Sequence, residues 1–337
     1  MHPELSLILL TVLAGVGQGL FAFLVGADIR LSGTGGLPAD AAVAGAGAAL
    51  AFTLAGTAAS FFHLTHPERG WKAILQWKKS WLSREVVLLP AFQGLAALYG
   101  LCAYAGVDIW IRYAVGSLGI VAALWLYLAS GMLYAKIRFI KEWSNVYTPI
   151  NYALVGLATG SVAGVAVLEL LGAPAEGTLA ALRGAFAVMS LGLLTKAMSY
   201  HHNAHIYSST NAQTATGFSH SLIKLMDMGV SYDHYNTKEY AYRTGLNRSV
   251  LRAVALLILF VVPFVVLTMD YMPLLSGSQG SMAVVAALLA VTGAFLERWL
   301  FFTDGNHAQN LYYGNFIEKG ISNPLLQRAK AGTPAPR

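Results

Sequence analysis

Long apolar runs with few or no charged residues recur about eight times along the 337-residue chain. A helix rises 1.5 Å per residue, so about 20 residues cross roughly 30 Å of hydrocarbon, and the runs are close to this length. In lipid only helices or a closed barrel satisfy the backbone, and the runs lack the alternation of barrel strands. We therefore predict an all-α, polytopic transmembrane bundle, with spans near residues 5–27, 41–64, 86–107, 113–135, 147–168, 179–200, 253–269 and 281–302.

The composition agrees with a membrane protein and argues against other classes. Only 11% of the residues are Asp, Glu, Lys or Arg and 56% are hydrophobic, whereas an ordinary soluble domain has roughly 25% charged residues. The formal net charge is +6, but no basic stripe interleaved with aromatic residues indicates nucleic acid, so we expect no such partner. Cys102 is the single cysteine, which excludes an internal disulfide and a thiolate set for an iron–sulfur cluster.

Basic residues concentrate in alternate loops. The loops after the second, fourth and sixth runs hold most of them, and the intervening loops hold few. Because Lys and Arg are enriched in cytoplasmic loops, we place these loops and both termini on the cytoplasmic side of the inner membrane. The first run lacks the basic segment of a signal peptide, so we expect it to span. We expect one membrane domain over residues 1–320 and a flexible tail over 321–337.

Two titratable side chains lie at the adjoining ends of two neighbouring apolar runs. His63 closes the second run and Glu85 opens the third, and the stretch between them contains Pro67, basic residues and tryptophans. Ionisable groups at the boundary of the hydrocarbon layer are costly, which makes this pair a functional candidate. The alternative is that His63 only ends a helix and that Glu85 is a first-turn residue favoured by the helix dipole.

Gln18 is an amide in the middle of the first run, flanked by Gly17 and Gly19. Small residues of this kind allow close helix packing, and we expect most glycines of the spans to serve that purpose. A bare amide in lipid is costly. We therefore expect Gln18 either to hydrogen-bond across the bundle or to line a polar pocket.

Three charged residues lie near the cytoplasmic ends of the sixth and eighth runs. Long charged side chains at helix ends extend their heads to water while the stems stay in the apolar layer. We expect this arrangement for Glu297 and Arg298. For Lys196 we consider both this arrangement and a place in a polar pocket.

The longest break between runs covers residues 201–249 and is rich in Tyr, Asn, Thr and His. An ordered loop of this length usually has a function, and its aromatic and amide content suits a protein–protein surface. We predict that it forms a cytoplasmic docking loop for a partner. The candidate docking residues are Thr214, Thr216, Gly217, Phe218, Tyr232, Tyr235 and Tyr240.

Histidines raise the question of haem or metal binding. A haem b needs axial histidines on facing helices, and of the nine histidines only His63, His201 and His202 lie even at the ends of spans. We therefore expect no haem, with a single haem between His63 and His201 or His202 as the alternative. The HHNAH stretch lacks the acidic partner of a zinc protease motif, and we expect no metal site.

Proton-coupled chemistry on a lipid-soluble quinone fits the remaining polar residues better. Such a site needs groups that titrate near neutral pH beside an apolar pocket. His63, Glu85, Gln18 and Lys196 could supply its polar part. The rivals are a free-standing small-molecule transporter, for which the chain shows no convincing inverted repeat, and an anchor without a quinone site.

Several motifs of the sequence resemble those of a known protein family. His63-Leu64 at the end of the second run is followed by Pro67 and Arg69, then by a Trp-rich loop and WLSREV at the start of the third run. The long loop contains TATGF and then SYDHYNTKEYAYR. With these motifs the chain resembles, over nearly its whole length, the membrane-anchor subunits of the dimethyl sulfoxide reductase family and the related polysulfide reductase and NrfD-like anchors.

The resemblance implies a subunit that binds quinone, either ubiquinone or menaquinone, without holding a metal centre of its own. It also implies two partner subunits, a four-cluster ferredoxin-like iron–sulfur subunit and a molybdopterin catalytic subunit. This chain, embedded in the membrane lipid, would anchor both of them. His63 and Glu85 match positions implicated in quinol binding in the family. Thr65 and His66 replace the usual small residue there, which leaves open whether His66 takes that role in place of His63.

The predicted orientation favours one direction of the reaction, although the sequence alone does not identify the direction of electron flow. A cytoplasmic docking face resembles the arrangement of the inward-facing, sulfite-oxidising relatives, so we favour the anchor of a sulfite dehydrogenase that delivers electrons to quinone. The alternative is the anchor of a reductase for dimethyl sulfoxide or another S- or N-oxide, which would oxidise menaquinol at the same site.

Overall fold

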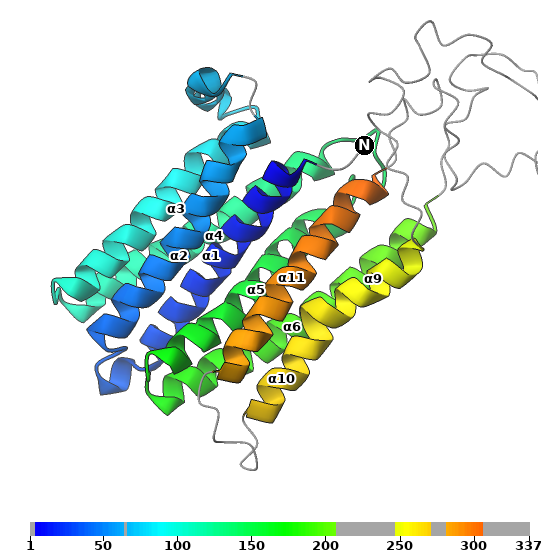
Figure 1. Ribbon diagram of the computed structural model, residues 1–337. Coiled ribbons are helices and arrows are strands. Elements are labelled where there is room, and N and C mark those ends of the chain that lie inside the picture. Colours follow the sequence, from blue (N-terminus) through cyan, green and yellow to red (C-terminus); the bar gives the residue numbers. More distant parts are fainter. Residues whose placement is uncertain (1–3, 64–65, 207–246, 271–280, 306–337) are drawn as a thin grey trace, which may run out of the picture.

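The computed structural model describes residues 4–63, 66–206, 247–270 and 281–305, and within them the chain forms helices and no strands (Figure 1). Eight helical segments of these ranges are long and apolar enough to cross a membrane. The prediction of an all-α transmembrane bundle is confirmed. The long helices are α1 (Leu5–Arg30), α2 (Ala39–Ser60), α3 (Trp81–Tyr104), α4 (Ile109–Ala135), α5 (Tyr147–Leu170), α6 (Ala175–Ala204), α9 (Arg248–Leu256) continued by α10 (Val262–Asp270), and α11 (Ser281–Asp304).

Helices α2 and α3 begin and end earlier than their apolar runs predict. Helix α2 ends at Ser60 and is followed by the 3₁₀ turn η2 (Phe61–His63), and α3 begins at Trp81. Ser80 caps α3, because its hydroxyl accepts a hydrogen bond of 3.4 Å from the backbone N–H of Ser83. The polar residues after Ser80 therefore belong to the helix, and Glu85 lies more than a turn inside it.

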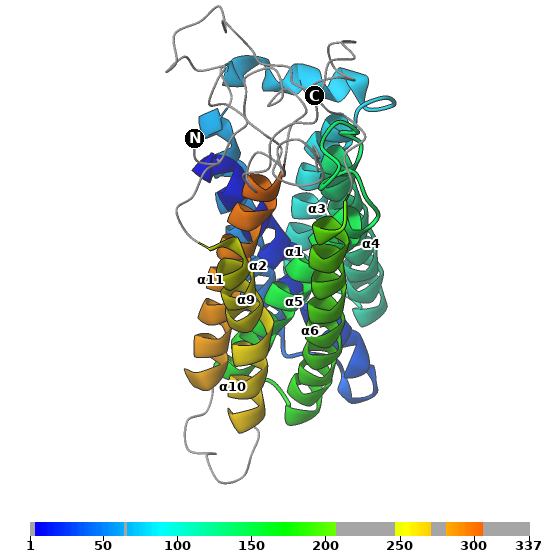
Figure 2. The ribbon, with the colours of Figure 1, turned by 90° about the vertical axis from the view of Figure 1, so that its right-hand side faces the viewer.

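Helices α1 and α5 form the centre of the bundle (Figure 2). Two-thirds of the residues in their most apolar windows are buried, against 28–39% in the other spans. Helix α1 contacts α2, α4, α5, α6 and α11. A polar residue of α1 or α5 that faces inward is therefore shielded from lipid by neighbouring helices.

Glycines bring α1 into direct contact with its neighbours. A Cβ atom added at Gly17 would lie 2.6 Å from the carbonyl oxygen of Ala49 in α2. A Cβ added at Gly160 of α5 would overlap the backbone of Gly19 and Leu20. The expectation that these glycines serve packing is confirmed.

A methyl group at this crossing should therefore destabilise the protein. We expect Gly160→Ala to lower the unfolding free energy by about 1–3 kcal/mol, because two backbones would have to separate. Thermal unfolding in detergent measures the effect. Gly164→Ala, one turn further along α5, is the matched control, since its Cβ would lie 3.5 Å from the Cβ of Phe23, an ordinary contact. Equal melting temperatures for the two variants would contradict the expected crossing.

The seventh span is one helix with a wider turn in its middle. Residues Leu257–Val261 form a π-helical turn, η4, between α9 and α10. Pro263 lies two residues after this turn, and its missing N–H and bulky ring disturb the regular hydrogen bonds of the preceding turn. Gly293 of α11 packs against the backbone of Leu259 here. The irregular turn is thus covered on the side of α11 by protein, which shields part of its backbone from lipid.

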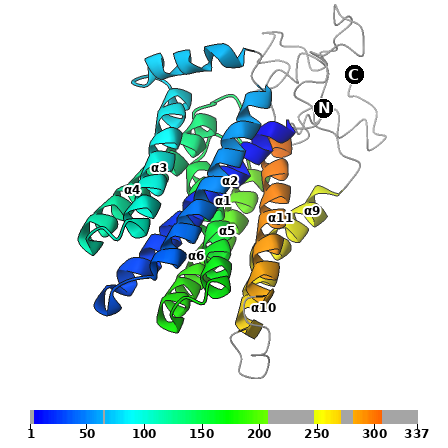
Figure 3. The same cartoon turned by 60° about the vertical axis from the view of Figure 1, so that its left-hand side comes forward.

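One end of the bundle collects most of the connections with basic residues. It contains the start of α1, the turn η2, the 3₁₀ helix η3 (Pro67–Gln76) and the last turns of α6 and α11, and we call it the η3 end (Figure 1). Helix η3 lies crosswise to the spans (Figure 3). Trp71 and Trp77 have exposed fractions of 61% and 55%, which suits aromatic side chains at a membrane–water interface.

Candidate functional site

Glu85 points from α3 into the bundle and contacts α4. The hydroxyl of Ser130 donates a hydrogen bond of 2.6 Å to Glu85 Oε1, and Glu85 is partly buried. The helix dipole is therefore not the main partner of this carboxyl, which favours the functional interpretation over the first-turn alternative. An ionisable group held inside the spans, with a neutral hydroxyl as its partner, is a functional candidate.

Glu85 and Gln18 line the same small cavity, so the structure brings together two of the predicted site residues. Gln18 is 3% exposed, and its Oε1 has no hydrogen-bond partner among the residues described. Of the two alternatives for Gln18, the polar pocket is therefore the one observed. The first cavity is lined by Leu10, Thr11, Ala14, Gly15, Gln18, Glu85, Leu89, Leu126, Tyr127, Ser130 and Tyr152.

The size of this first cavity limits what it holds. Its volume is about 20 Å³, which is enough for a single water molecule. Pockets for small organic ligands are roughly 300–1,000 Å³. A quinone ring therefore does not fit between Gln18 and Glu85, and these two groups are placed to handle a water or a proton beside such a ring.

His63 and His66 lie at the η3 end, in different settings. The backbone of His63 ends η2, which contacts the α1 helix, while its side chain lies outside the described part of the chain. His66 is exposed, and its Nδ1 lies 3.1 Å from Glu68 Oε1 in a surface pair. His66 lines neither this cavity nor the one described next.

Lys196 lies in a second, neighbouring cavity, and it does not extend to water. Its Nζ forms an ion pair with Glu297 Oε1, and Arg298 Nη2 lies 3.8 Å from Glu297 Oε2. The three residues are only 4%, 1% and 3% exposed. The expectation that Glu297 and Arg298 extend to the interface is wrong, because each faces an opposite charge that makes burial tolerable.

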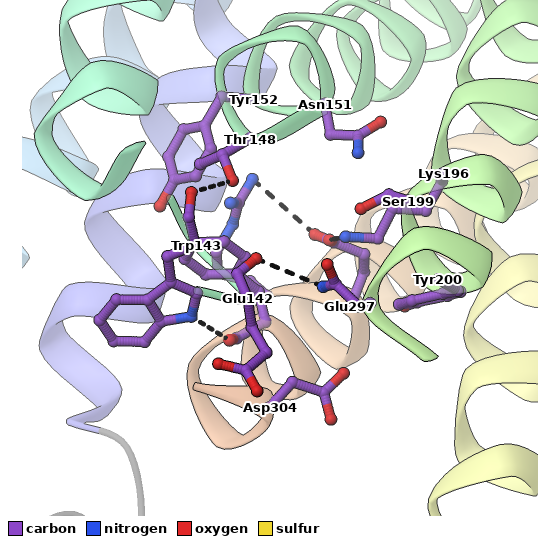
Figure 4. Close-up of a pocket in the computed structure, with 13 residues that line it drawn as sticks. Glu142, Trp143, Thr148, Asn151, Tyr152, Lys196, Ser199, Tyr200, Glu297 and Asp304 are labelled. Carbon is purple, nitrogen blue, oxygen red and sulfur yellow. Dashed lines mark hydrogen bonds and ion pairs between the residues drawn. The ribbon is translucent and has the colours of Figure 1, made fainter. Parts of the chain in front are cut away.

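This second cavity is ringed by polar side chains from α5, α6 and α11 (Figure 4). Its volume is about 20 Å³. Several polar atoms of its lining have no hydrogen-bond partner in the described ranges: Asn151 Oδ1, Tyr152 Oη, Tyr200 Oη, Glu297 Oε2 and Arg298 Nε. The lining residues are Glu142, Trp143, Thr148, Asn151, Tyr152, Lys196, Ser199, Tyr200, Asn203, Glu297, Arg298, Phe301 and Asp304.

The connection between α4 and α5 covers this second cavity towards the η3 end. The indole N–H of Trp143 donates to the carbonyl oxygen of Phe301 in α11, at 2.8 Å. The side-chain amide of Asn203 in α6 donates to the carbonyl oxygen of Glu142, at 3.3 Å. These bonds tie the connection to α6 and α11, so this side of the cavity has fixed walls.

Asp304 lines the second cavity and pairs with Arg252 beside it, and we call this pair the rim. Arg252 of α9 donates two hydrogen bonds to Asp304 at the end of α11, of 3.1 and 2.5 Å. The side chains are 17% and 8% exposed. Arg248, whose side chain is 41% exposed, lies 3.7 Å from Asp304 Oδ1, so this bidentate pair lies close to the aqueous side.

The remaining histidine candidates lie on the surface. His201 and His202 are exposed at the end of α6, and the ring of His202 lies 5.5 Å from that of Tyr147. No group of three or more His, Cys, Asp or Glu residues is arranged to hold a metal within the described ranges. All predicted docking residues, from Thr214 to Tyr240, lie outside them.

Sequence reasoning missed several residues of the second cavity, above all Tyr152, Asn151 and Tyr200. A signal was available, because Lys196, Glu297 and Arg298 are opposite charges inside two different apolar runs. Such charges in spans usually pair with one another. What the sequence did not reveal is which helix faces which.

A charged cluster also lies at the opposite end of the bundle, and its role is structural. Asp28 is fully buried and accepts hydrogen bonds from Arg112, at 2.6 Å, and from the Tyr99 hydroxyl and the Leu37 N–H, both at 2.7 Å. Each oxygen of Asp28 is thus satisfied. This cluster joins α1, α3 and α4, and of its polar atoms Arg112 Nε has no hydrogen-bond partner in the described ranges. Several such atoms gather around the cavities of the η3 end, which is therefore the candidate site.

The fold and the site together define a multi-pass membrane protein with titratable side chains buried at one end of a helical bundle. Residues 1–314 match the family model of the DMSO reductase anchor subunit (DmsC). The chain belongs to this family of membrane-anchor subunits. A subunit of the sulfite dehydrogenase of Allochromatium vinosum is 33% identical over 332 residues, which cover 93% of this chain and 99% of that protein.

Family membership confirms the resemblance seen in the motifs. The chain is a membrane-anchor subunit of an oxidoreductase complex, with catalytic and electron-transfer subunits as its partners. The transporter alternative is set aside, because the matched region covers all eight spans.

Proposed function

We propose that this chain is the anchor subunit of a sulfite dehydrogenase and passes the electrons of sulfite to quinone. The similarity to a sulfite dehydrogenase subunit over nearly both whole chains supports the reaction. The basic loops of the η3 end support a docking face and both termini on the cytoplasmic side of the inner membrane. The partners would be a four-cluster ferredoxin-like iron–sulfur subunit and a molybdopterin catalytic subunit.

One observation carries the quinone part of the proposal: Glu85 is held by Ser130 beside a water-sized cavity at the η3 end. Oxidation of sulfite with water to sulfate releases two electrons and two protons, and reduction of a quinone to the quinol takes up two of each. The electrons come from the partner subunits. The protons must reach the quinone oxygens through groups of this chain, and a carboxyl inside the spans is such a group.

The position of each residue indicates its role in this proton transfer. His63 would hydrogen-bond one quinone oxygen at the η3 end and exchange a proton with it. Glu85 and Gln18 would hold the water that supplies the next proton, because their cavity accepts a water and excludes the ring. Lys196 pairs with Glu297 in the neighbouring cavity, so we assign it no contact with the quinone.

A second candidate reaction rests on the family model, whose description names DMSO reductase. A reductase of dimethyl sulfoxide or another S- or N-oxide would oxidise menaquinol at the same site and release its protons along the same groups. The two candidates differ in the substrate of the catalytic partner and in the direction of electron flow.

A purification with paired assays tests the proposal. The tagged chain, solubilised gently, should co-purify with molybdopterin and four-cluster ferredoxin-type subunits, as mass spectrometry identifies them. We expect the complex to reduce decylubiquinone with sulfite, and the catalytic part without this chain to reduce only ferricyanide. Turnover of dimethyl sulfoxide with a reduced quinone analogue, without sulfite turnover, would favour the second candidate. A lone chain without partners would reject both.

A further inference from the structure

Tyr152 is the residue that lines both cavities of the η3 end. It lies on α5, at the centre of the bundle, with Glu85 and Gln18 on one side. Lys196 and Glu297 line the cavity on its other side (Figure 4). The two polar spaces therefore adjoin at one phenol ring.

The Tyr152 hydroxyl and other polar atoms of the two cavities need water molecules as hydrogen-bond partners. This hydroxyl makes no direct hydrogen bond in the described structure, although the side chains of Tyr134 and Arg298 pack against its ring. Gln18 Oε1 in the first cavity and Glu297 Oε2 in the second have no hydrogen-bond partner in the described residues either. Buried polar atoms are almost always satisfied by protein or by ordered water. Each cavity has room for about one water, so a water in each cavity is the natural hydrogen-bond partner for these atoms.

Charge in the second cavity suits the passage of protons. Glu297 lies between two cations, the ammonium of Lys196 and the guanidinium of Arg298. Its free oxygen therefore accepts hydrogen bonds from water, and Arg298 Nε donates one. A water held in this way is oriented, and the rim at Arg252 and Asp304 brings the cavity close to the aqueous phase.

We propose that the two cavities form one hydrated proton route, joined at the Tyr152 hydroxyl, that connects Glu85 with the aqueous face at the Arg252–Asp304 rim. Protons taken from water enter at the rim, pass the water held by Glu297 and Arg298, and cross the Tyr152 hydroxyl to reprotonate Glu85. No electron moves along this route. The inference rests on the proposed function, because it supplies the protons for the quinone site.

The position of the Tyr152 ring allows the role of its hydroxyl to be tested alone. The ring stacks with Tyr134 at a centroid separation of 5.6 Å. The guanidinium of Arg298 lies over it at 3.8 Å from the centroid. Phenylalanine keeps both contacts and removes only the hydroxyl, so Tyr152→Phe interrupts the route while preserving the packing.

The test compares Tyr152→Phe with Tyr113→Phe in the whole complex. The hydroxyl of Tyr113 donates to the backbone oxygen of Asp28 at 3.2 Å, at the opposite end of the bundle. We expect Tyr152→Phe to lower the kcat with decylubiquinone about 10-fold or more and to increase its solvent deuterium isotope effect. The quinone KM and the turnover with ferricyanide should stay unchanged, and Tyr113→Phe should behave as the wild type.

Three outcomes would overturn the route. One is an unchanged kcat and isotope effect in Tyr152→Phe while Glu85→Gln stops quinone turnover. Another is a raised quinone KM at constant kcat, which would place Tyr152 in contact with the quinone. The third is an equal loss in Tyr113→Phe. If Glu85→Gln itself retains full quinone turnover, the proposed function fails at its site, which separates the two failures.

Discussion

Glu85→Gln is expected to lower quinone-linked turnover of the complex by about 100-fold or more, because the loss of a proton-transfer group typically lowers the rate by this much. The amide has the same shape and still accepts the hydrogen bond from Ser130, so the helices should pack as before. It does not carry a proton, which is the property that the reaction requires. Turnover of sulfite with ferricyanide should be unchanged, because those electrons leave before they reach this chain.

The matched control for this prediction is Glu68→Gln. Glu68 also lies at the η3 end, but its side chain is 62% exposed and pairs only with His66 and Arg69 on the surface. We expect full quinone turnover in this variant, since surface pairs of this kind contribute little. A loss in Glu68→Gln as large as that in Glu85→Gln would mean that general charge at this face, and not the buried carboxyl, supports the reaction.

Lys196→Met is expected to have the largest effect on stability. It leaves Glu297 buried at 1% exposure with only Arg298, at 3.8 Å, as a compensating charge. Breaking one side of a buried pair costs about 3–5 kcal/mol. We therefore expect a clear fall in the melting temperature of the purified complex and less assembled protein in the membrane.

Neutralising both partners should recover much of this loss. In the double variant Lys196→Met with Glu297→Gln, no uncompensated carboxylate remains, and neutral replacements of a buried pair are often tolerated. Lys79→Met, an exposed lysine near η3, is the control and should leave the melting temperature unchanged. If the single and double variants melt at the same temperature, the ion pair contributes nothing beyond the packing of its side chains.

The bundle itself could be predicted because hydrocarbon imposes a strong condition on the sequence. A span must hold about 20 apolar residues in succession, and all eight predicted runs overlap helices of the structure. The ends of the helices were harder to predict, because a change to polar residues marks the end of the apolar layer and not the end of the helix. The Ser80 cap starts α3 among polar residues, and this placed Glu85 inside the helix.

The candidate site was predictable only in part. Glu85 and Gln18 stood out because titratable and amide groups are rare in spans, and the structure places them at one cavity. Lys196 was assigned to the same pocket, although it pairs with Glu297 in the adjacent one. For Glu297 and Arg298 the position near a helix end favoured extension to water, and the rotation of α11 brought both side chains inward instead.

The sequence by itself determined the class of protein, the number of spans and the family, because each of these depends on local apolar length and on motifs. Only the tertiary structure decided which polar groups meet. An apolar run is hydrophobic on all sides, so its sequence does not show which side faces the neighbouring helices. Close contacts such as that of Gly19 with Gly160 set the rotation of each helix. Those contacts place Tyr152 between two cavities, since the pairing of buried polar groups follows from helix packing and not from their spacing along the chain.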